Sequence, residues 1–379
     1  MKLLFFFSLL MLAYIYAGYP LAAALLARRR PRPVRKGVFE PRVTILIAAY
    51  NEEKVIGATL ANKLALDYPP DKLEILVVSD ESTDQTDAIV ASFAHRGVRL
   101  IRQEPRAGKT AALNRAVVAA KGEILVFSDA NSQYAPHALR YLVENFADPQ
   151  VGYVTGKMVY TNSDGTMTGD GCSAYMRYEN RLREAETAIG SVVGVDGGID
   201  AVRRELYRPM NPDQLPDFVL PLRVVEQGYR VVYEPKALLW EAALQDVSDE
   251  YRMRVRVSLR AFWALRDMRQ LLAWKNDPLF CWQLWSHKVL RYLAFLFLAG
   301  TFFGNLAVWS AGPGYRIFFI LQFAAYLGVA ICGGLERVGV RYRPFGFVHY
   351  FVLVNLAAAQ AFGKFLLGRK QVVWTPRKG

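Results

Sequence analysis

One short stretch carries side chains whose types and spacing suit chemistry. In "ILVFSDANSQY" (124–134), four apolar residues lead into Asp129 and Asn131. At a strand end, positions i and i+2 point to one side, so this carboxylate and this amide could share one hard cation, Mg²⁺ or Mn²⁺. Taken alone, an Asp-x-Asn stretch is more typical of an ordinary turn. Which interpretation is favoured, a metal site or a turn, depends on the strands and helices that surround the stretch.

Those elements alternate between strands and helices. A capped helix follows the second strand, and "GKTAALNRAVVAA" (108–120) predicts another before the fourth strand. Such alternation implies an α/β domain, a Rossmann-like, mostly parallel sheet over residues 40–245. Ligands of such sheets bind beyond the carboxyl ends of the strands, so Asn51, Asp80 and Asp129 should line one crevice. Continuous apolar runs predict the strands at 43–50, 72–80, 98–103 and 123–129.

Composition and missing motifs exclude several classes. No GxGxxG follows the first strand and no GxxxxGK[ST] occurs, so neither a dinucleotide fingerprint nor a Walker-type ATP site is supported. Three cysteines and four histidines are scattered, which argues against disulfides and zinc. A chain that is 53% hydrophobic with net charge +13 is unlike a disordered one. It fits a membrane protein with a basic cytoplasmic side, or a nucleic-acid binder.

The apolar N-terminus favours the membrane. Residues 3–27 are long enough to span a bilayer and longer than the core of a cleaved signal peptide, which is the alternative. We therefore predict a signal anchor over residues 1–27. The basic run "RRRPRPVRK" after it, against Lys2 alone before it, places the domain that follows in the cytoplasm.

The C-terminal region, 289–368, predicts further transmembrane helices. With one span before the domain and three after it, the C-terminal tail would lie outside, yet "GRKQVVWTPRKG" is basic. Either the tail breaks the charge rule, or the last segment lies partly in the interface. The three apolar segments are about 289–311, 315–334 and 346–367.

Residues 246–288 join the domain to these segments. In "SLRAFWALRDMRQLLAWKNDPLFCWQLWSHK" (258–288), arginine and lysine alternate with tryptophan, phenylalanine and leucine. That composition is typical of amphipathic helices lying in the headgroup plane. It also occurs in nucleic-acid binders, but no nucleic-acid motif appears elsewhere, so we expect no nucleic-acid partner.

Taken in order, motifs over residues 43–260 resemble the family 2 inverting glycosyltransferases. The likeness is to the membrane-bound branch of cellulose, hyaluronan and poly-N-acetylglucosamine synthases, which implies a GT-A-type domain between transmembrane helices. Each motif is weak alone, and their order makes the resemblance specific. They are "AAYNEEKVI", "VVSDESTDQT", "RAGKTAALNRA", "FSDAN", "GVDGGIDAVRREL" and "LPDFVLPLRVVEQGYRVVYEP".

The resemblance implies a role for each matching residue. Asp217 stands at the position of the base that deprotonates the acceptor hydroxyl. Asp129, with Asn131 as a variant third residue of the DxD motif, would hold Mg²⁺ or Mn²⁺ on the donor diphosphate. The remaining positions match substrate-binding ones; for each, a helix cap or a solvated face is the alternative. They are Asn51, Glu52, Asp80, Lys109, Arg254 and Arg256.

The chain also departs from the family's pattern. Processive synthases carry Gln-Arg-x-Arg-Trp before the interfacial helices, whereas this chain has "MRVRV", with Met253 and Val257 in place of Gln and Trp. That departure favours transfer of one or a few sugars over synthesis of a long chain. The donor that the resemblance implies is a UDP-sugar, and the acceptor is lipid-linked or a polysaccharide. The expected location is the inner (plasma) membrane. A processive synthase and a non-catalytic sugar-nucleotide-binding protein are the alternatives.

Overall fold

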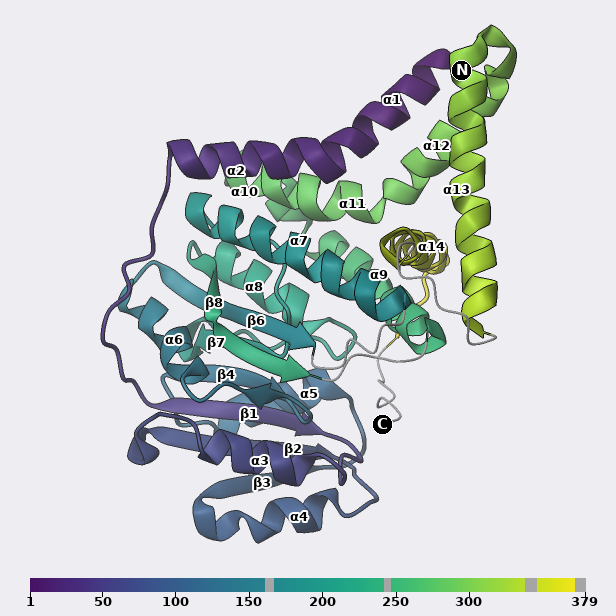
Figure 1. The fold of residues 1–379 in the computed structure, drawn as a ribbon. Helices are drawn as coiled ribbons and strands as arrows, with labels where there is room; N and C mark the ends of the chain where they lie inside the picture. Colours follow the sequence, from purple (N-terminus) through teal and green to yellow (C-terminus); the bar gives the residue numbers. More distant parts are fainter. Residues whose placement is uncertain (161–166, 242–246, 338–345, 372–379) are drawn as a thin grey trace.

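An eight-stranded sheet forms the centre of the protein (Figure 1). Its strand order in this computed structural model is β3-β2-β1-β4-β7-β6-β8-β5. The structure describes residues 1–160, 167–241, 247–337 and 346–371.

The first four strands are parallel and confirm the predicted half of the sheet. β1 is buried at every position, as its unbroken apolar run requires for a strand covered on both faces. The carboxyl ends of β1, β2 and β4 therefore meet at one edge. These strands are β1 Val43–Ala49, β2 Leu73–Asp80, β3 Val98–Gln103 and β4 Ile124–Asp129.

The second half of the sheet is mixed. β7 runs antiparallel to both β4 and β6, while β6 and β8 are parallel. The sheet is therefore mostly parallel, as predicted, and β7 and the short β5 run against the other strands. These strands are β5 Gln133–Tyr134, β6 Val151–Tyr160, β7 Ile199–Arg203 and β8 Arg230–Glu241.

Helices cover both faces of the sheet. Alternate residues of β1 point to opposite faces, so Ile45 and Ile47 enter one core and Leu46 enters the other. The first core packs against α3 Ile56–Leu64, α4 Thr86–Ser92 and α6 Ala138–Glu144. The second packs against α5 Lys109–Ala119, α8 Pro216–Glu226 and α9 Val247–Asp267. Short 3-10 turns lie at Pro70–Lys72, Ala94–Arg96, Asn145–Ala147, Arg204–Leu206, Arg269–Leu272 and Trp309–Ala311.

Long apolar helices lie beyond α7 Met167–Ile189 and α9, at the top of Figure 1. Among the described residues, three helices are long and apolar enough to cross a membrane: 2–29, 313–331 and 346–366. The predicted span 289–311 is instead interrupted, because two helical stretches meet there at 57° and would together make a fourth. The elements are α1 Lys2–Ala13, the π-helical turn Tyr14–Gly18, α2 Tyr19–Arg29, α10 Pro278–Leu284, the π-helical turn Trp285–Val289, α11 Leu290–Tyr292, α12 Ala294–Ala307, α13 Pro313–Arg337 and α14 Gly346–Leu366.

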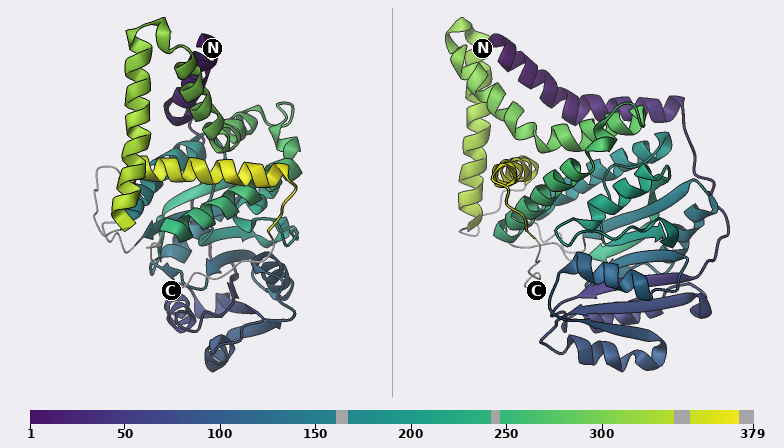
Figure 2. Two further views of the ribbon diagram at one scale, coloured as in Figure 1. Left: turned by 90° about the vertical axis from the view of Figure 1, so that its right-hand side faces the viewer. Right: turned by 180° about the vertical axis from the view of Figure 1, so that it is seen from behind.

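The last helix has a different direction from its neighbours. α14 is seen end-on in Figure 1 and lies across α13 in Figure 2. It packs along α7 and α9. The chain after it returns to α9 and to the loop before α8, where Arg260 donates to the carbonyl of Gln371 at 3.0 Å and Lys370 pairs with Asp213. The tail therefore lies on the same side of the apolar helices as the sheet.

Candidate active site

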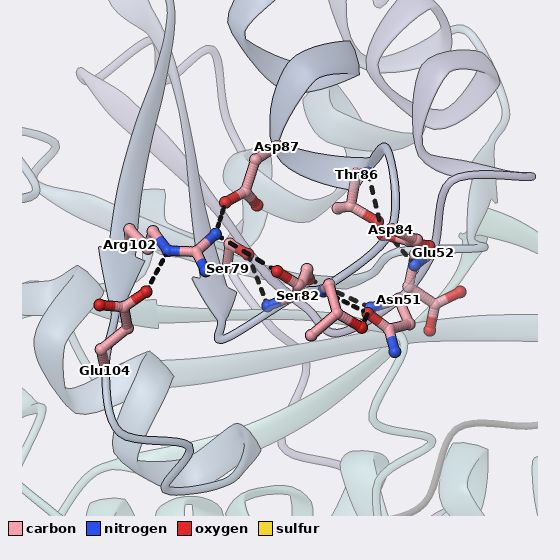
Figure 3. Close-up of polar contacts among 10 residues, drawn as sticks. Asn51, Glu52, Ser79, Ser82, Asp84, Thr86, Asp87, Arg102 and Glu104 are labelled. Atoms are coloured by element: carbon pink, nitrogen blue, oxygen red, sulfur yellow. Dashed lines mark hydrogen bonds and ion pairs between the residues drawn. The ribbon is translucent and has the colours of Figure 1, made fainter.

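The turn after β1 is locked to the loop after β2 (Figure 3). Asn51 has a left-handed backbone with φ 53°, a conformation that asparagine tolerates better than most residues. Its Oδ1 accepts from the Thr83 backbone N–H at 2.8 Å, and its own N–H donates to the Ser82 hydroxyl at 3.1 Å. The backbone N–H of Glu52 donates to Thr86 at 2.8 Å. Asn51 and Glu52 thus shape one rim of the crevice.

Asp84 and Arg102 complete the contacts that hold this rim. Hydrogen bonds from Thr86 and Glu53 hold the pKa of the Asp84 carboxyl below its usual range, although burial opposes them. Arg102 pairs with Asp87 and with Glu104 across the end of β3. These contacts are visible in Figure 3 and make the segment after β2 a fixed wall.

Asp80 is fully buried and anchors the next loop. Its carboxylate accepts from Gln103 Nε2 at 2.6 Å and from the backbone N–H groups of Ala107 and Gly108 at 2.8 Å each. A carboxylate with several such donors is satisfied within the protein. Asp80, predicted as a substrate-binding residue, fixes the loop that leads into α5 and Lys109 in this structure.

Lys109 and Asp129 meet at the centre of the crevice. Lys109 Nζ lies 2.5 Å from Asp129 Oδ1. Burial alone would lower the pKa of Lys109, but the carboxylates of Asp129 and Asp217 hold it above its usual range. The Asp129 side chain is one-third exposed, so it remains accessible to a ligand. The structure therefore brings together three of the predicted residues.

The residues around Asp129 fit a hard cation only in part. Asn131 Nδ2 donates to Glu241 Oε1 at 3.3 Å, which leaves the amide oxygen for other contacts. Across the described parts of the chain, no three His, Cys, Asp or Glu residues are arranged so that they could hold a metal ion by themselves. One carboxylate, one amide oxygen and the oxygens of a substrate diphosphate match the way Mg²⁺ and Mn²⁺ commonly bind.

Asp217 lies at the start of α8, directly after Pro216, and touches Gly197. A Cβ on Gly197 would come within 2.5 Å of the Asp217 carboxyl, and Gly197 has φ +86°. Only glycine fits such a close approach in that conformation. Burial raises the pKa of Asp217, Lys109 lowers it and Asp129 raises it further; the net direction is upward.

Asp200 is a further acid in this cluster, which the sequence did not single out. It is buried on β7, with Phe127 of β4 and Thr155 of β6 as its strand partners. Burial, followed by the charge of Asp217, raises the pKa of Asp200 to about 8. An aspartate inside the strand pattern of "GGIDAV" was the available signal, since strand interiors rarely hold this residue.

The two predicted arginines of α9, Arg254 and Arg256, lie on different sides of the helix. Arg256 and Arg260 are one turn apart, and both act electrostatically on Asp217. Arg254, two residues before Arg256, lies on another side of the helix, where it pairs with Glu250 at 2.8 Å. Arg256 therefore joins the Asp217 cluster, whereas Arg254 faces the helices at the membrane side.

Comparisons with known proteins agree with this geometry. Residues 44–208 match the model of "Glycosyl transferase family 2". Poly-beta-1,6-N-acetyl-D-glucosamine synthase of Staphylococcus aureus (strain COL) is 28% identical over 272 residues, 66% of this chain and 64% of that enzyme. The Staphylococcus epidermidis enzyme of the same name is 25% identical over 276 residues, 68% of this chain and 66% of the other.

One solved structure resembles nearly the whole chain. The mannosyltransferase PcManGT from Pyrobaculum calidifontis, in complex with GDP-Man and Mn²⁺, is 25% identical, with a TM-score of 0.75 over 97% of this chain and 99% of that one. This likeness includes the apolar helices as well as the sheet. The strand-end crevice, the ordered motifs and these matches agree: residues 44–208 match glycosyl transferase family 2, and the chain as a whole has the fold of a solved glycosyltransferase.

Proposed function

We propose that the enzyme is a membrane-bound, inverting transferase that moves a sugar from a nucleotide-diphosphate sugar onto a lipid-linked acceptor or a growing polysaccharide. The observation that carries this proposal is the cluster of Lys109, Asp129 and Asp217 at the carboxyl ends of the strands. It combines a cation and a metal-capable carboxylate with a separate acid that can act as a base.

Asp217 is the proposed base. The acceptor oxygen attacks the anomeric carbon from the face opposite the diphosphate, the carbon–oxygen bond to the diphosphate breaks, and the hydroxyl proton passes to Asp217. A carboxyl whose pKa is raised accepts that proton more readily than an ordinary one. Lys109 and Arg256 supply positive charge to the departing diphosphate.

Asp129 and the amide oxygen of Asn131 are the proposed protein ligands of Mg²⁺ or Mn²⁺. When bound, the ion neutralises charge on the diphosphate. In this reading Lys109, which now holds Asp129, is placed to contact the same diphosphate. The Mn²⁺ in the PcManGT complex supports the assignment.

The donor and the acceptor are proposed by class. A UDP-sugar is the donor expected from the sequence, whereas the GDP-Man bound to PcManGT supports a GDP-sugar. Poly-beta-1,6-N-acetyl-D-glucosamine synthase as a relative supports a second candidate, processive polysaccharide synthesis. The altered "MRVRV" segment favours transfer of one or a few sugars.

The direction of α14 supports a particular membrane topology. With α12 and α13 as the crossings after the domain, the chain returns to the side of the sheet, and α14 then lies along the membrane face. The contacts of Arg260 with Gln371 and of Lys370 with Asp213 support this side. Arg369 and Lys370 are then cytoplasmic together with the sheet, as the charge rule expects at a plasma membrane.

Incubating membranes that contain the enzyme with radiolabelled UDP- and GDP-sugars, then sizing the product, tests the proposal. We expect Mn²⁺- or Mg²⁺-dependent labelling of a lipid-extractable product by one donor. A long, water-soluble polymer would favour the processive candidate. Binding without transfer to any acceptor fraction would instead support a non-catalytic protein.

A further inference from the structure

A second cavity lies away from the crevice, between the membrane-side helices. Its volume is about 520 Å³, and the π-helical turn after α1, α7, α9, the stretch 287–292 and α14 contribute to its walls. Arg254 belongs to this cavity, which explains why it lies apart from Arg256. One side of α9 therefore lines the cavity, and another side of the same helix places Arg256 and Arg260 near Asp217.

Basic side chains form the polar wall of the cavity: Arg254, Lys288 and Arg291. Arg254 is held by Glu250 at 2.8 Å and Arg291 by Glu179 at 2.5 Å. Both glutamates are buried behind the wall and do not line the cavity. These two arginines are thus each balanced by one carboxylate and fixed in place.

The Arg291 guanidinium is also surrounded by aromatic rings. Its centre lies 5.9 Å from the ring of Tyr16, 5.1 Å from Tyr175 and 5.2 Å from Tyr178. Cation–π contacts of this kind hold a guanidinium without consuming its outer hydrogen-bond donors. The polar wall is therefore rigid and rich in donors.

Lys288 differs from these arginines because its nearest carboxylates, Glu179 and Glu186, act on it only from beyond ion-pair distance. Within the parts of the chain that the structure describes, no carboxylate lies within ion-pair distance of its ammonium. The ammonium lies 5.9 Å from the centre of the Phe218 ring. A Cβ on Gly194 would lie 2.3 Å from its Nζ. Phe218 follows Asp217 in α8, so Lys288 joins the cavity wall to the helix that carries the proposed base. An anion in the cavity would balance this partly buried charge.

The opposite wall is apolar and comes from α14. Phe347, Val348, Phe351, Val354 and Ala358 line it. Phe347 is also 55% exposed, so the apolar wall continues to the outer surface of the helix that lies along the membrane side. A cavity with a cationic wall and an apolar wall at that place matches an amphiphile with a charged headgroup.

We propose that this cavity binds the acceptor as a lipid with an anionic, phosphate-bearing headgroup, its phosphate on Lys288, Arg291 and Arg254 and its chain along α14. The inference rests on the proposed function, because it names the acceptor class of the same reaction. The donor diphosphate is a poor occupant, since its crevice lies on the Arg256 side of α9. The position of Lys288 beside the Asp217 segment directs the headgroup toward the transferred sugar.

The test uses the full chain purified in a neutral detergent and three probes: dioctanoyl phosphatidic acid, dioctanoylglycerol and inorganic phosphate. Binding is followed by thermal shift and by intrinsic fluorescence. We expect phosphatidic acid to bind at least roughly tenfold more tightly than dioctanoylglycerol, because a charge-assisted contact is lost in the latter. Inorganic phosphate should bind far more weakly than either lipid, since it lacks the chains.

Two variants and one control locate the binding. Lys288→Met should remove the preference for phosphatidic acid, and Val354→Phe, which fills the apolar side without changing charge, should weaken both lipids. Lys275→Met is the matched control, an exposed lysine of the same interfacial region, and should bind like the wild type. Equal binding of the two lipids, or a preference that survives Lys288→Met, would overturn the proposal. Inorganic phosphate binding as tightly as phosphatidic acid would assign the site to a free anion.

Donor binding separates this inference from the proposed function. Each variant is titrated with UDP- and GDP-sugars in Mn²⁺, and Lys288→Met should retain the wild-type affinity. Lipid binding without any sugar transfer would contradict the proposed function alone. Sugar transfer by a protein that shows no preference for the anionic lipid would contradict the inference alone.

Discussion

The donor crevice and the membrane-side cavity are built in different ways. The crevice is made by the ends of consecutive parallel strands, so Asn51, Asp80 and Asp129 meet because the sheet brings them there. The cavity is made by segments from both ends of the chain, with Tyr16 and Tyr350 among its walls. One edge of a sheet can therefore be predicted from local sequence patterns, whereas a cavity assembled by helix packing cannot.

The largest effect should come from the proposed base. Asp217→Asn should lower transfer by about 10²–10⁴-fold and leave donor affinity close to that of the wild type, because it removes proton acceptance and not charge on the donor side. Since the pKa of Asp217 is raised, kcat/KM of the wild type should fall as the pH drops, at a higher pH than for an ordinary aspartate. Near-normal turnover by this variant would remove Asp217 as the base.

A comparable loss should follow from the metal side of the crevice. Asp129→Ala should abolish the part of nucleotide affinity that depends on Mn²⁺, because the variant lacks the accessible carboxylate proposed as a metal ligand. Calorimetric titration of UDP and GDP with and without Mn²⁺ measures this. Asp71→Ala, an exposed aspartate in the turn before β2, is the control and should keep the metal dependence. An Asp129→Ala protein that still responds to Mn²⁺ would refute the metal role.

A smaller effect should come from the contact between the donor and acceptor sides. Gly197→Ala places a Cβ 2.5 Å from the Asp217 carboxyl and should lower kcat by roughly 100-fold through misplacement of the base. Gly228→Ala is the matched control, since Gly228 has φ +87° with nothing within 4 Å of the added Cβ. Both variants carry the same backbone strain, so equal losses in kcat would show that strain and not contact is responsible.

The smallest effect concerns stability. The pKa of Asp200 rises to about 8 on folding, so the folded protein binds this proton more tightly and loses stability as pH rises from about 4 to 8. Asp200→Asn, which cannot ionise, should therefore be more stable than the wild type at pH 8 by an amount on the order of a few kcal/mol, and show less difference at pH 5. Thermal unfolding in detergent at both pH values measures this; a wild-type advantage that is larger at pH 8 would contradict it.

The sequence predicted the donor half of the molecule well. Four strands began and ended within about one residue of their predicted places, because their apolar runs are unbroken and end in polar residues. It predicted a shared role for Arg254 and Arg256 only because they match one motif. Their separation follows from helix geometry and from the packing of α14. Neither Asp200 nor Lys288 lies in a motif from which its buried neighbours could be predicted.

The segment after α14 also bears on the order in which the protein can assemble. Arg260 and Trp263 of α9 donate to the carbonyls of Gln371 and Arg369, which lie 111 and 106 residues further along the chain. These contacts therefore cannot form before α12, α13 and α14 have been synthesised and placed. A defect in placing those helices should leave Arg260 and Trp263 without these two partners.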